Sequence, residues 1–170
     1  MHQHDLVSII ITAGASAWFT NALDSALSQD YPHIEIIVAD YSDASFVHKK
    51  LQGYLVRYGH LLRYLKIDDG TVPVYQAAVS AARGKYIKFL SDADLLKPAC
   101  VSTLVSGLMT QPECRVAASR RERVGPQGEV LPELISTSAL YSENSIINGQ
   151  DLLRNQTLKA YSLPGEMTAA

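Results

Sequence analysis

Short apolar runs and apolar positions spaced three or four apart alternate through the first 110 residues. The runs Val7–Ile11 and Ile34–Val38 are rich in β-branched residues and bounded by turn residues, as buried strands are. Two further strands are predicted over residues 61–67 and 86–90. Between the strands, apolar residues repeat at the spacing of one helix face, which predicts four helices. These positions are Trp18, Phe19, Ala22, Leu23, Ala26 and Leu27; then Val47, Leu51, Tyr54, Leu55 and Tyr58; then Val74, Ala77, Ala78, Ala81 and Ala82; and finally Val101, Leu104, Val105, Leu108 and Met109.

Strands that alternate with helices through short connections predict an α/β fold, with a mostly parallel central sheet and helices on both faces. Gly84 suits the end of the third helix, and Pro98 suits the first turn of the fourth. At 170 residues the chain has the length of one domain, so a single domain over residues 1–170 is expected.

The alternation breaks down after Cys114. A strand is predicted over 115–119, a hairpin turn over 125–128 and a short helix around 150–155. The last stretch, residues 163–170, shows no pattern of a finishing helix.

Composition narrows the class of protein. Hydrophobic residues make up 47% and charged residues 19% of the chain, and the net charge is −2, which argues against a domain built to bind nucleic acid. No apolar run approaches the roughly 20 residues that span a bilayer. Met1–Asp5 lacks the order of a secretory signal, and two cysteines do not make a disulfide framework. A cytoplasmic location is therefore expected.

Candidate chemistry gathers after three of the strands. In open α/β sheets ligands bind at the carboxyl ends of the strands, where Thr12–Ser16, Asp40–Asp43 and Ser91–Asp94 fall. Asp92 and Asp94 form a D-x-D pair, whose oxygen ligands suit Mg²⁺ or Mn²⁺ held together with substrate phosphates. The same acids also fit an ordinary strand end and helix cap, because a lone D-x-D is a weak motif.

The order of several segments is more specific than any one of them. In order and spacing they resemble the bacterial family-2 glycosyltransferases, whose GT-A fold is Rossmann-like, over nearly the whole chain. The segments are residues 7–11, 22–32, 34–40 and 84–98, with residues 119–121 and 149–153 similar to some members of that family.

The resemblance implies an inverting, metal-dependent transferase that moves a sugar from a nucleotide-diphosphate donor to an acceptor hydroxyl. It implies a nucleotide-sugar-binding domain truncated before the acceptor-binding half. Because the family's general base lies beyond the donor-binding half, no catalytic residue is assigned. The implied nucleotide-sugar-binding residues are Thr12, Ala13, Asp40, Tyr41 and Asp92, and the implied metal ligands are Asp92 and Asp94.

Several positions depart from the family's pattern. The first loop, usually P-T-Y-N, reads Thr12–Ala15, and Tyr41 replaces the second of two acids after the second strand. Tyr41 can stack on a base or fill the pocket. Ala93 takes a position that often ligates the metal, so either the metal site shifts to Asp92 and Asp94 or metal binding is weakened. Gln76 and Ala78 replace an asparagine and a glycine.

Two functions of different class follow from these departures. The first is the metal-dependent glycosyltransferase. The alternative is a non-catalytic, degenerate domain of the same fold, used for partner binding or scaffolding. A homo-oligomer is a further hypothesis, because an incomplete sheet exposes apolar surface.

Other motifs are absent from the sequence or have simpler explanations. There is no G-x-G-x-x-G, no Walker-type loop and no G-x-S-x-G, and the histidines and cysteines lack zinc-ligand spacing. Arg120, Arg121 and Arg123 fit either a phosphate or membrane contact or, more simply, a solvated strand edge. Trp18 and Phe19 are expected to pack in the core rather than form a sugar platform.

Overall fold

The computed structural model describes residues 4–43, 45–67, 73–134, 143–159 and 167–169. The chain divides into two compact units: Met1–Ala117 with Met167–Ala170, and Ala118–Glu166. The single-domain boundary predicted from the sequence stays a prediction.

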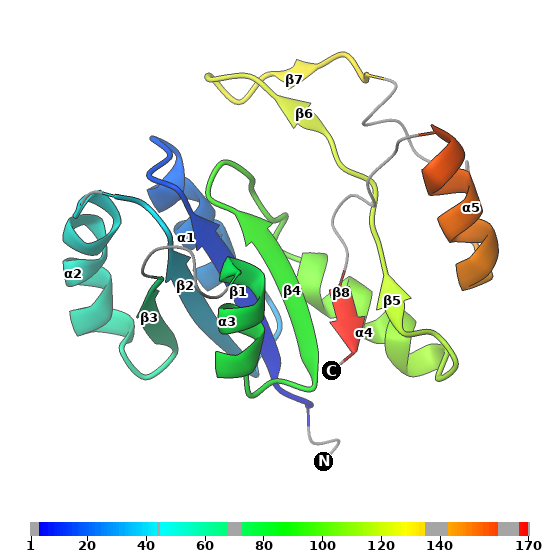
Figure 1. Cartoon of the computed structure of the whole chain (residues 1–170), viewed down its shortest axis with the longest axis horizontal. Coiled ribbons are helices and arrows are strands. Elements are labelled where there is room, and N and C mark those ends of the chain that lie inside the picture. Colours follow the sequence, from blue (N-terminus) through cyan, green and yellow to red (C-terminus); the bar gives the residue numbers. More distant parts are fainter. Residues whose placement is uncertain (1–3, 44, 68–72, 135–142, 160–166, 170) are drawn as a thin grey trace. The chain divides into compact units, whose positions relative to one another are not determined.

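A six-stranded sheet forms the centre of the first unit, in the order β3-β2-β1-β4-β8-β5 (Figure 1). The four strands from β3 to β4 are parallel, β8 runs antiparallel to β4, and β5 runs antiparallel to β8. β1 lies between β2 and β4, and every residue of β1 and β2 is buried, because both strands are covered on both faces. The strand bounds are β1 (Val7–Ala13), β2 (Ile34–Asp40), β3 (Leu62–Lys66), β4 (Tyr86–Ser91), β5 (Val116–Ala117) and β8 (Met167–Ala169).

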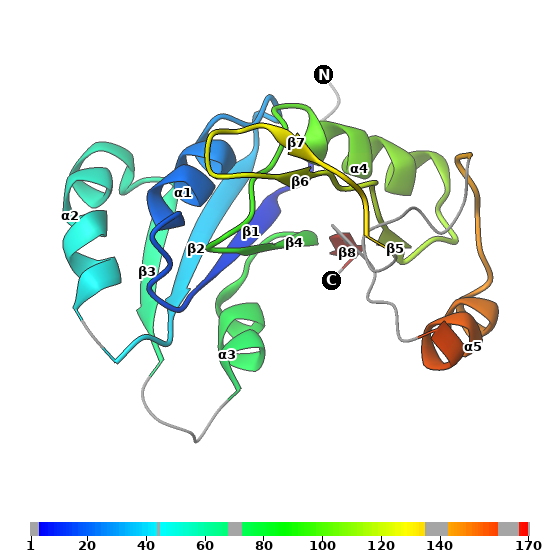
Figure 2. The same ribbon diagram turned by 90° about the horizontal axis from the view of Figure 1, so that it is seen from above.

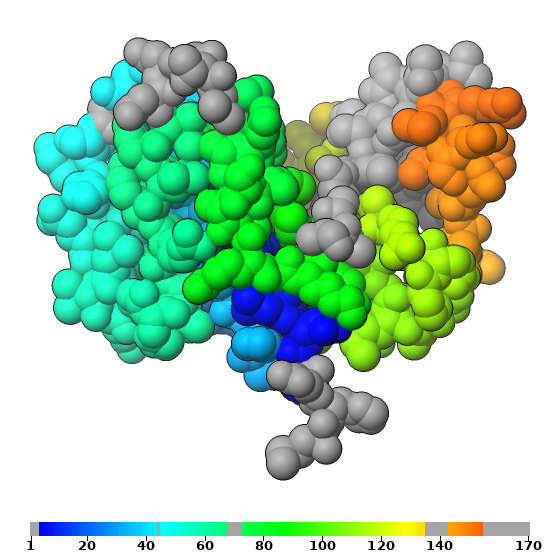
Figure 3. All heavy atoms as spheres, turned by 60° about the horizontal axis from the view of Figure 1, so that its bottom comes forward, coloured from blue at the N-terminus to red at the C-terminus, as the bar shows by residue number. Residues whose placement is uncertain are grey.

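Helices cover both faces of this sheet (Figure 2). The apolar stripes of α1 (Phe19–Leu27), α2 (Phe46–Tyr58) and α4 (Cys100–Thr110) pack on one face, in the larger core cluster. α3 (Val74–Ala81) packs on the other face over Ile10, Ile37 and Ile87. α3 lies at the molecular surface, in green in Figure 3, and exposes Tyr75 and Val79. The α/β fold predicted from the sequence is confirmed.

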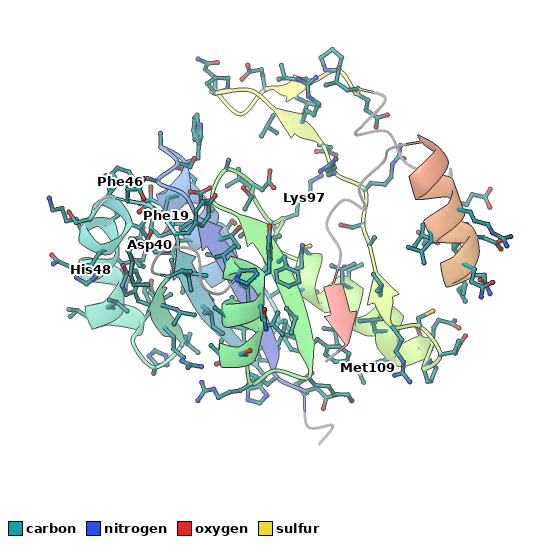
Figure 4. All side chains as sticks on the ribbon, in the orientation of Figure 1. Phe19, Asp40, Phe46, His48, Lys97 and Met109 are labelled. Atoms are coloured by element: carbon teal, nitrogen blue, oxygen red, sulfur yellow. The ribbon has the colours of Figure 1, made fainter. Side chains whose placement is uncertain are left out.

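Two residues expected in the helix stripes lie elsewhere. Trp18 is 44% exposed because it precedes α1 as the N-cap residue and so does not share the buried face of Phe19. Met109, labelled in Figure 4, is 57% exposed in the last turn of α4. Leu108 already occupies the inward position there, and the next residue is turned about 100° around the helix. The prediction of core packing is wrong for Trp18 and for Met109 and right for Phe19.

Gly84 has a different role from the one predicted. α3 ends at Ala81, and Ala82 is already extended. A Cβ atom on Gly84 would lie 2.5 Å from the backbone nitrogen of Ser8 and 2.9 Å from the carbonyl oxygen of Leu6. Glycine is therefore needed for a close approach of two backbone segments and not for the end of a helix.

The regular structure described within the second unit consists of a short hairpin and a helix. The predicted hairpin is present as β6 (Arg123–Val124) and β7 (Val130–Leu131), and Gly128 in its turn has a φ of +83°. α5 (Gly149–Lys159) is longer than the helix predicted there. Arg120 lies 3.6 Å from Glu133 in an exposed ion pair, outside the two strands of the hairpin. Within the described part of the chain, no helix is long and apolar enough to cross a bilayer.

Candidate functional site

The register of the parallel strands brings the predicted polar segments to one edge of the sheet. Ala13 lies opposite Asp40, and Thr12 lies opposite Ser91. The chain continues the pairing beyond the strands, because the Tyr41 amide donates to the carbonyl of Ala13 at 3.1 Å. The Asp92 amide donates to the carbonyl of Thr12 at 3.2 Å. The loop that follows β1, called the first loop from here on, consists of Gly14–Ser16 and therefore lies between the ends of β2 and β4.

The first loop contacts the side chain of Asp92. The backbone amides of Gly14 and Ser16 both donate to Asp92 Oδ2, at 2.8 and 2.9 Å. Ala15, between them, has a left-handed φ of +74°. Asp92 is 7% exposed, so its carboxylate lies beneath the loop and not on the open surface.

Tyr41 covers the same loop from the side of β2. A Cβ atom on Gly14 would lie 2.5 Å from the hydroxyl oxygen of Tyr41 and 2.8 Å from its Cζ atom. The tyrosine ring thus lies against the glycine, and half of the residue stays exposed. The Tyr41 ring occupies the space over Gly14, and a side chain at that loop position would have to displace the ring.

Asp40, labelled in Figure 4, is fully buried at the end of β2. Its Oδ1 accepts hydrogen bonds from the amide and hydroxyl of Ser42, at 2.9 and 2.6 Å. Its Oδ2 accepts a hydrogen bond from the hydroxyl of Tyr64 at 2.7 Å, and the ammonium nitrogen of Lys66 lies 3.7 Å from the same oxygen. Asp40 therefore ties the segment after β2 to β3.

The sequence interpretation missed these partners of Asp40. Lys66 ends the strand that pairs with β2, but its position opposite Asp40 depends on the strand register, which the sequence pattern leaves open. Tyr64 carried no signal, since its position in a short strand gave no sign of which acid its hydroxyl would reach.

Asp94 is the exposed member of the D-x-D pair. Its amide donates to the carbonyl of Ser91 at 3.1 Å, and the Ala93 amide donates to the hydroxyl of Ser91 at 3.3 Å, so Ser91–Asp94 form a turn. Among the residues that the structure describes, no three histidine, cysteine or acidic side chains gather to hold a metal ion.

A third buried carboxylate, which the sequence analysis did not single out, lies at the other end of the sheet. Glu35 Oε1 accepts the Ser8 hydroxyl and the Arg83 amide, both at 2.7 Å, and its Oε2 lies 2.8 Å from the Arg83 guanidinium. The Ser8 hydroxyl in turn accepts the Gly84 amide at 2.8 Å. Burial raises the pKa of Glu35, but the hydrogen bonds from Ser8 and Arg83 outweigh it and hold the pKa below its ordinary value.

Comparison with known proteins identifies the family. The family model described as Glycosyl transferase family 2 matches residues 8–168. The chain belongs to this glycosyltransferase family. The match begins in β1 and ends in β8, so it includes every segment that forms the strand-end edge.

Curated relatives that are named glycosyltransferases match part of the chain. An uncharacterized glycosyltransferase of Rickettsia bellii is 35% identical over 97 residues, which are 56% of this chain and 14% of the relative. Another from Rickettsia prowazekii is 36% identical over 95 residues, which are 55% of this chain and 29% of the relative. The chain therefore matches less than a third of the length of these glycosyltransferases.

Solved glycosyltransferase structures share the fold. The mannosyltransferase PcManGT from Pyrobaculum calidifontis, in complex with GDP-Man and Mn²⁺, is 17% identical with a TM-score of 0.62, over 71% of this chain and 37% of that chain. S. aureus TarS 1–349 in complex with UDP-GlcNAc is 17% identical with a TM-score of 0.60, over 79% of this chain and 39% of that chain. The GT-A fold expected from the sequence is thereby confirmed.

Proposed function

We propose that this glycosyltransferase-family chain binds a nucleotide-diphosphate sugar at the carboxyl edge of β1, β2 and β4, for metal-dependent transfer of the sugar to an acceptor hydroxyl. The observation that carries the proposal is the meeting of three polar segments at this edge, with the first loop held between Tyr41 and Asp92. The ligands of the two solved neighbours, GDP-Man with Mn²⁺ and UDP-GlcNAc, support the substrate class.

The proposed nucleotide-sugar site is lined by the first loop and by the residues at the strand ends. Thr12 and Ala13 supply backbone next to the loop, and Tyr41 supplies a half-exposed aromatic ring. Asp40 is fully buried, and it contributes by holding in place the segment that carries Tyr41, through its hydrogen bond from the Ser42 amide. Asp92, which follows β4, borders the site on that side and contacts the first loop.

The available donors fit a divalent metal that is bound jointly with the diphosphate. Asp94 is exposed, and the second oxygen of Asp92, Oδ1, accepts no hydrogen bond within the part of the chain that the structure describes. Mg²⁺ is commonly held by one or two carboxylates plus substrate phosphates, so these two acids suffice without a third protein ligand. When bound, the metal would neutralise charge on the departing diphosphate.

A non-catalytic role is the second candidate. The ring of Tyr41 already occupies the space over Gly14, and Ala93 offers no oxygen beside the two acids. Both features favour a domain of the same fold that binds nucleotide weakly or serves in partner binding or scaffolding. The cytoplasmic location and self-association stay predictions, and no general base is assigned.

Calorimetric titration with UDP and GDP, each with and without Mn²⁺, tests the proposal. We expect one nucleotide to bind, with an affinity that rises on addition of Mn²⁺. The double variant Asp92→Asn plus Asp94→Asn should lose the metal-dependent part of this affinity, because the two carboxylates are its proposed protein ligands. Absence of binding to either nucleotide in the presence of Mn²⁺ would favour the non-catalytic domain.

A further inference from the structure

We infer that Asp92 is a positioning residue, which supplies the internal anion that holds the first loop in place. The amides of Gly14 and Ser16 converge on the single atom Asp92 Oδ2, at 2.8 and 2.9 Å. Ala15 between them is left-handed, with a φ of +74°. Alternate amides around a left-handed residue form a concave backbone nest that binds anions. In this chain the anion is Asp92.

The environment of Asp92 explains why these two hydrogen bonds matter. The residue is 7% exposed, so water does little to stabilise its charge. The two loop amides are the hydrogen-bond donors to its carboxylate within the described residues. Hydrogen bonds to an ionised, buried group are about twice as strong as neutral ones. Charge on Asp92 and order in the first loop therefore depend on each other.

The backbone of Ala15 points to the same conclusion from the side of the loop. A left-handed conformation is unfavourable for alanine and persists where surrounding contacts hold it. The amides on both sides of Ala15 are the ones that donate hydrogen bonds to Asp92. Asp92, reaching the loop from the end of β4, thus holds a conformation that the loop sequence alone does not prefer.

The two oxygens of Asp92 then have separate roles, a step that rests on the proposed function. Oδ2 holds the loop with or without a metal, whereas Oδ1 and the exposed Asp94 are left for the ion. Asp92 and Asp94 therefore differ in one respect that can be measured. Loss of Asp92 should disturb the loop in the absence of metal, and loss of Asp94 should not.

Amide hydrogen exchange followed by NMR, without nucleotide or metal, compares the whole chain with Asp92→Asn and Asp94→Asn. We expect Asp92→Asn to raise the exchange rates of the Gly14 and Ser16 amides at least tenfold, because a neutral amide oxygen is a weaker acceptor. The amides of Ile9–Ile11 should keep their rates, and Asp94→Asn should leave the loop as it is. Unchanged loop amides in Asp92→Asn, or an equal effect of Asp94→Asn, would overturn the inference.

The unsubstituted chain provides a test that does not depend on a variant folding. In protein labelled with ¹⁵N and ¹³C, scalar coupling across a hydrogen bond links an amide nitrogen to the carbon of its acceptor. We expect coupling from Gly14 and Ser16 nitrogens to the side-chain carboxyl carbon of Asp92. Absence of both couplings would contradict the internal-anion role, whatever the variants do.

Nucleotide affinity in excess EDTA separates positioning from mere structural support. We expect metal-free affinity for the nucleotide that binds to fall about fivefold or more in Asp92→Asn. Equal metal-free affinity in the unsubstituted chain and Asp92→Asn would remove Asp92 from the positioning of the site. If the unsubstituted chain binds no nucleotide, the proposed function fails, and the exchange and coupling data still decide whether Asp92 holds the loop.

Discussion

Single carboxylates determine much of the local structure, and Glu35 shows how. It lies in β2 with its side chain 3% exposed, and it accepts hydrogen bonds from Ser8 and Arg83. Burial alone would raise the pKa of Glu35, but the hydrogen bonds from Ser8 and Arg83 lower it below its ordinary value. The carboxyl group of Glu35 therefore binds its proton less tightly in the folded protein than in the unfolded chain. Folding is therefore linked to ionisation of this group.

We predict that Glu35→Gln lowers the free energy of unfolding by about 2 kcal/mol at pH 7, because the hydrogen bonds to a charged group are lost. The pKa of Glu35 is depressed in the folded state, so its contribution is complete above the ordinary value of 4.5 and is lost as the pH falls through the folded pKa. Urea unfolding at pH 7, 4.5 and 3.5 should show a difference between the two proteins that shrinks with acidity.

Asp30→Asn is the matched control, because Asp30 is exposed and its carboxylate has no ion pair in the described structure. This variant should unfold like the unsubstituted protein at each pH. A difference for Glu35→Gln that grows toward pH 3.5 would show that the sign of the linkage is wrong.

The positions of the acids could be predicted from the sequence, but their partners could not. Asp40 and Asp92 follow apolar strands, and the rule that ligand sites lie at strand ends placed both at one edge. Tyr64 reaches Asp40 from 24 residues away, and the Gly14 amide reaches Asp92 from 78 residues away. Such pairs depend on the register between strands, which the periodicity of each segment leaves open.

At the scale of elements, the turn from α3 into β4 is set by a glycine. A methyl group on Gly84 would meet backbone atoms of Ser8 and Leu6, which cannot move without disturbing β1. Gly53, in the interior of α2, has no atom within 4 Å of its added Cβ. The same substitution is thus expected to have opposite effects at the two positions.

We predict that Gly84→Ala destabilises the protein by about 1–3 kcal/mol, because the added carbon overpacks fixed backbone. Gly53→Ala should stabilise it by about 1 kcal/mol through helix propensity. Thermal unfolding of both variants measures the two effects side by side. A stable Gly84→Ala protein would mean that β1 and the turn approach each other less closely than described.

The elements with a strong pattern of their own were predictable, and β8 was not. β1, β2, α1 and α2 have the apolar spacing of buried strands and helix faces over most of their length. β8 is only three residues long and forms by pairing with β4 and β5, so its conformation comes from its neighbours. Trp18 marks the same limit at a helix end, where one position separates a buried face from an exposed cap.

At the scale of the whole molecule, the buried apolar residues that the structure describes all belong to the first unit. Both core clusters consist of residues from the first unit, from Val7 to Ala117. In the second unit, Val124, Val130 and Leu153 are exposed. Regions with few buried apolar contacts open at low free energy cost, without unfolding the rest.

We predict that hydrogen exchange monitored by mass spectrometry separates the two units. Peptides from β1, β2 and β4 should exchange only by global unfolding, since these strands pair with one another and are buried. Peptides from β6, β7 and the described part of α5 should exchange orders of magnitude faster. Equal protection of the two groups would indicate that the chain unfolds as a single cooperative body.

The central place of β1 has a consequence for the nascent chain. β1 pairs with β4 on one side, where Val7 lies opposite Tyr86. A ribosome adds 5–20 residues per second, so β4 is synthesised about 4–16 seconds after β1. During this delay a stretch of seven apolar or small residues, without charge or proline, has one unpaired edge. Such stretches readily stack with copies of themselves. The yield of soluble protein should therefore depend on what shields β1 during synthesis.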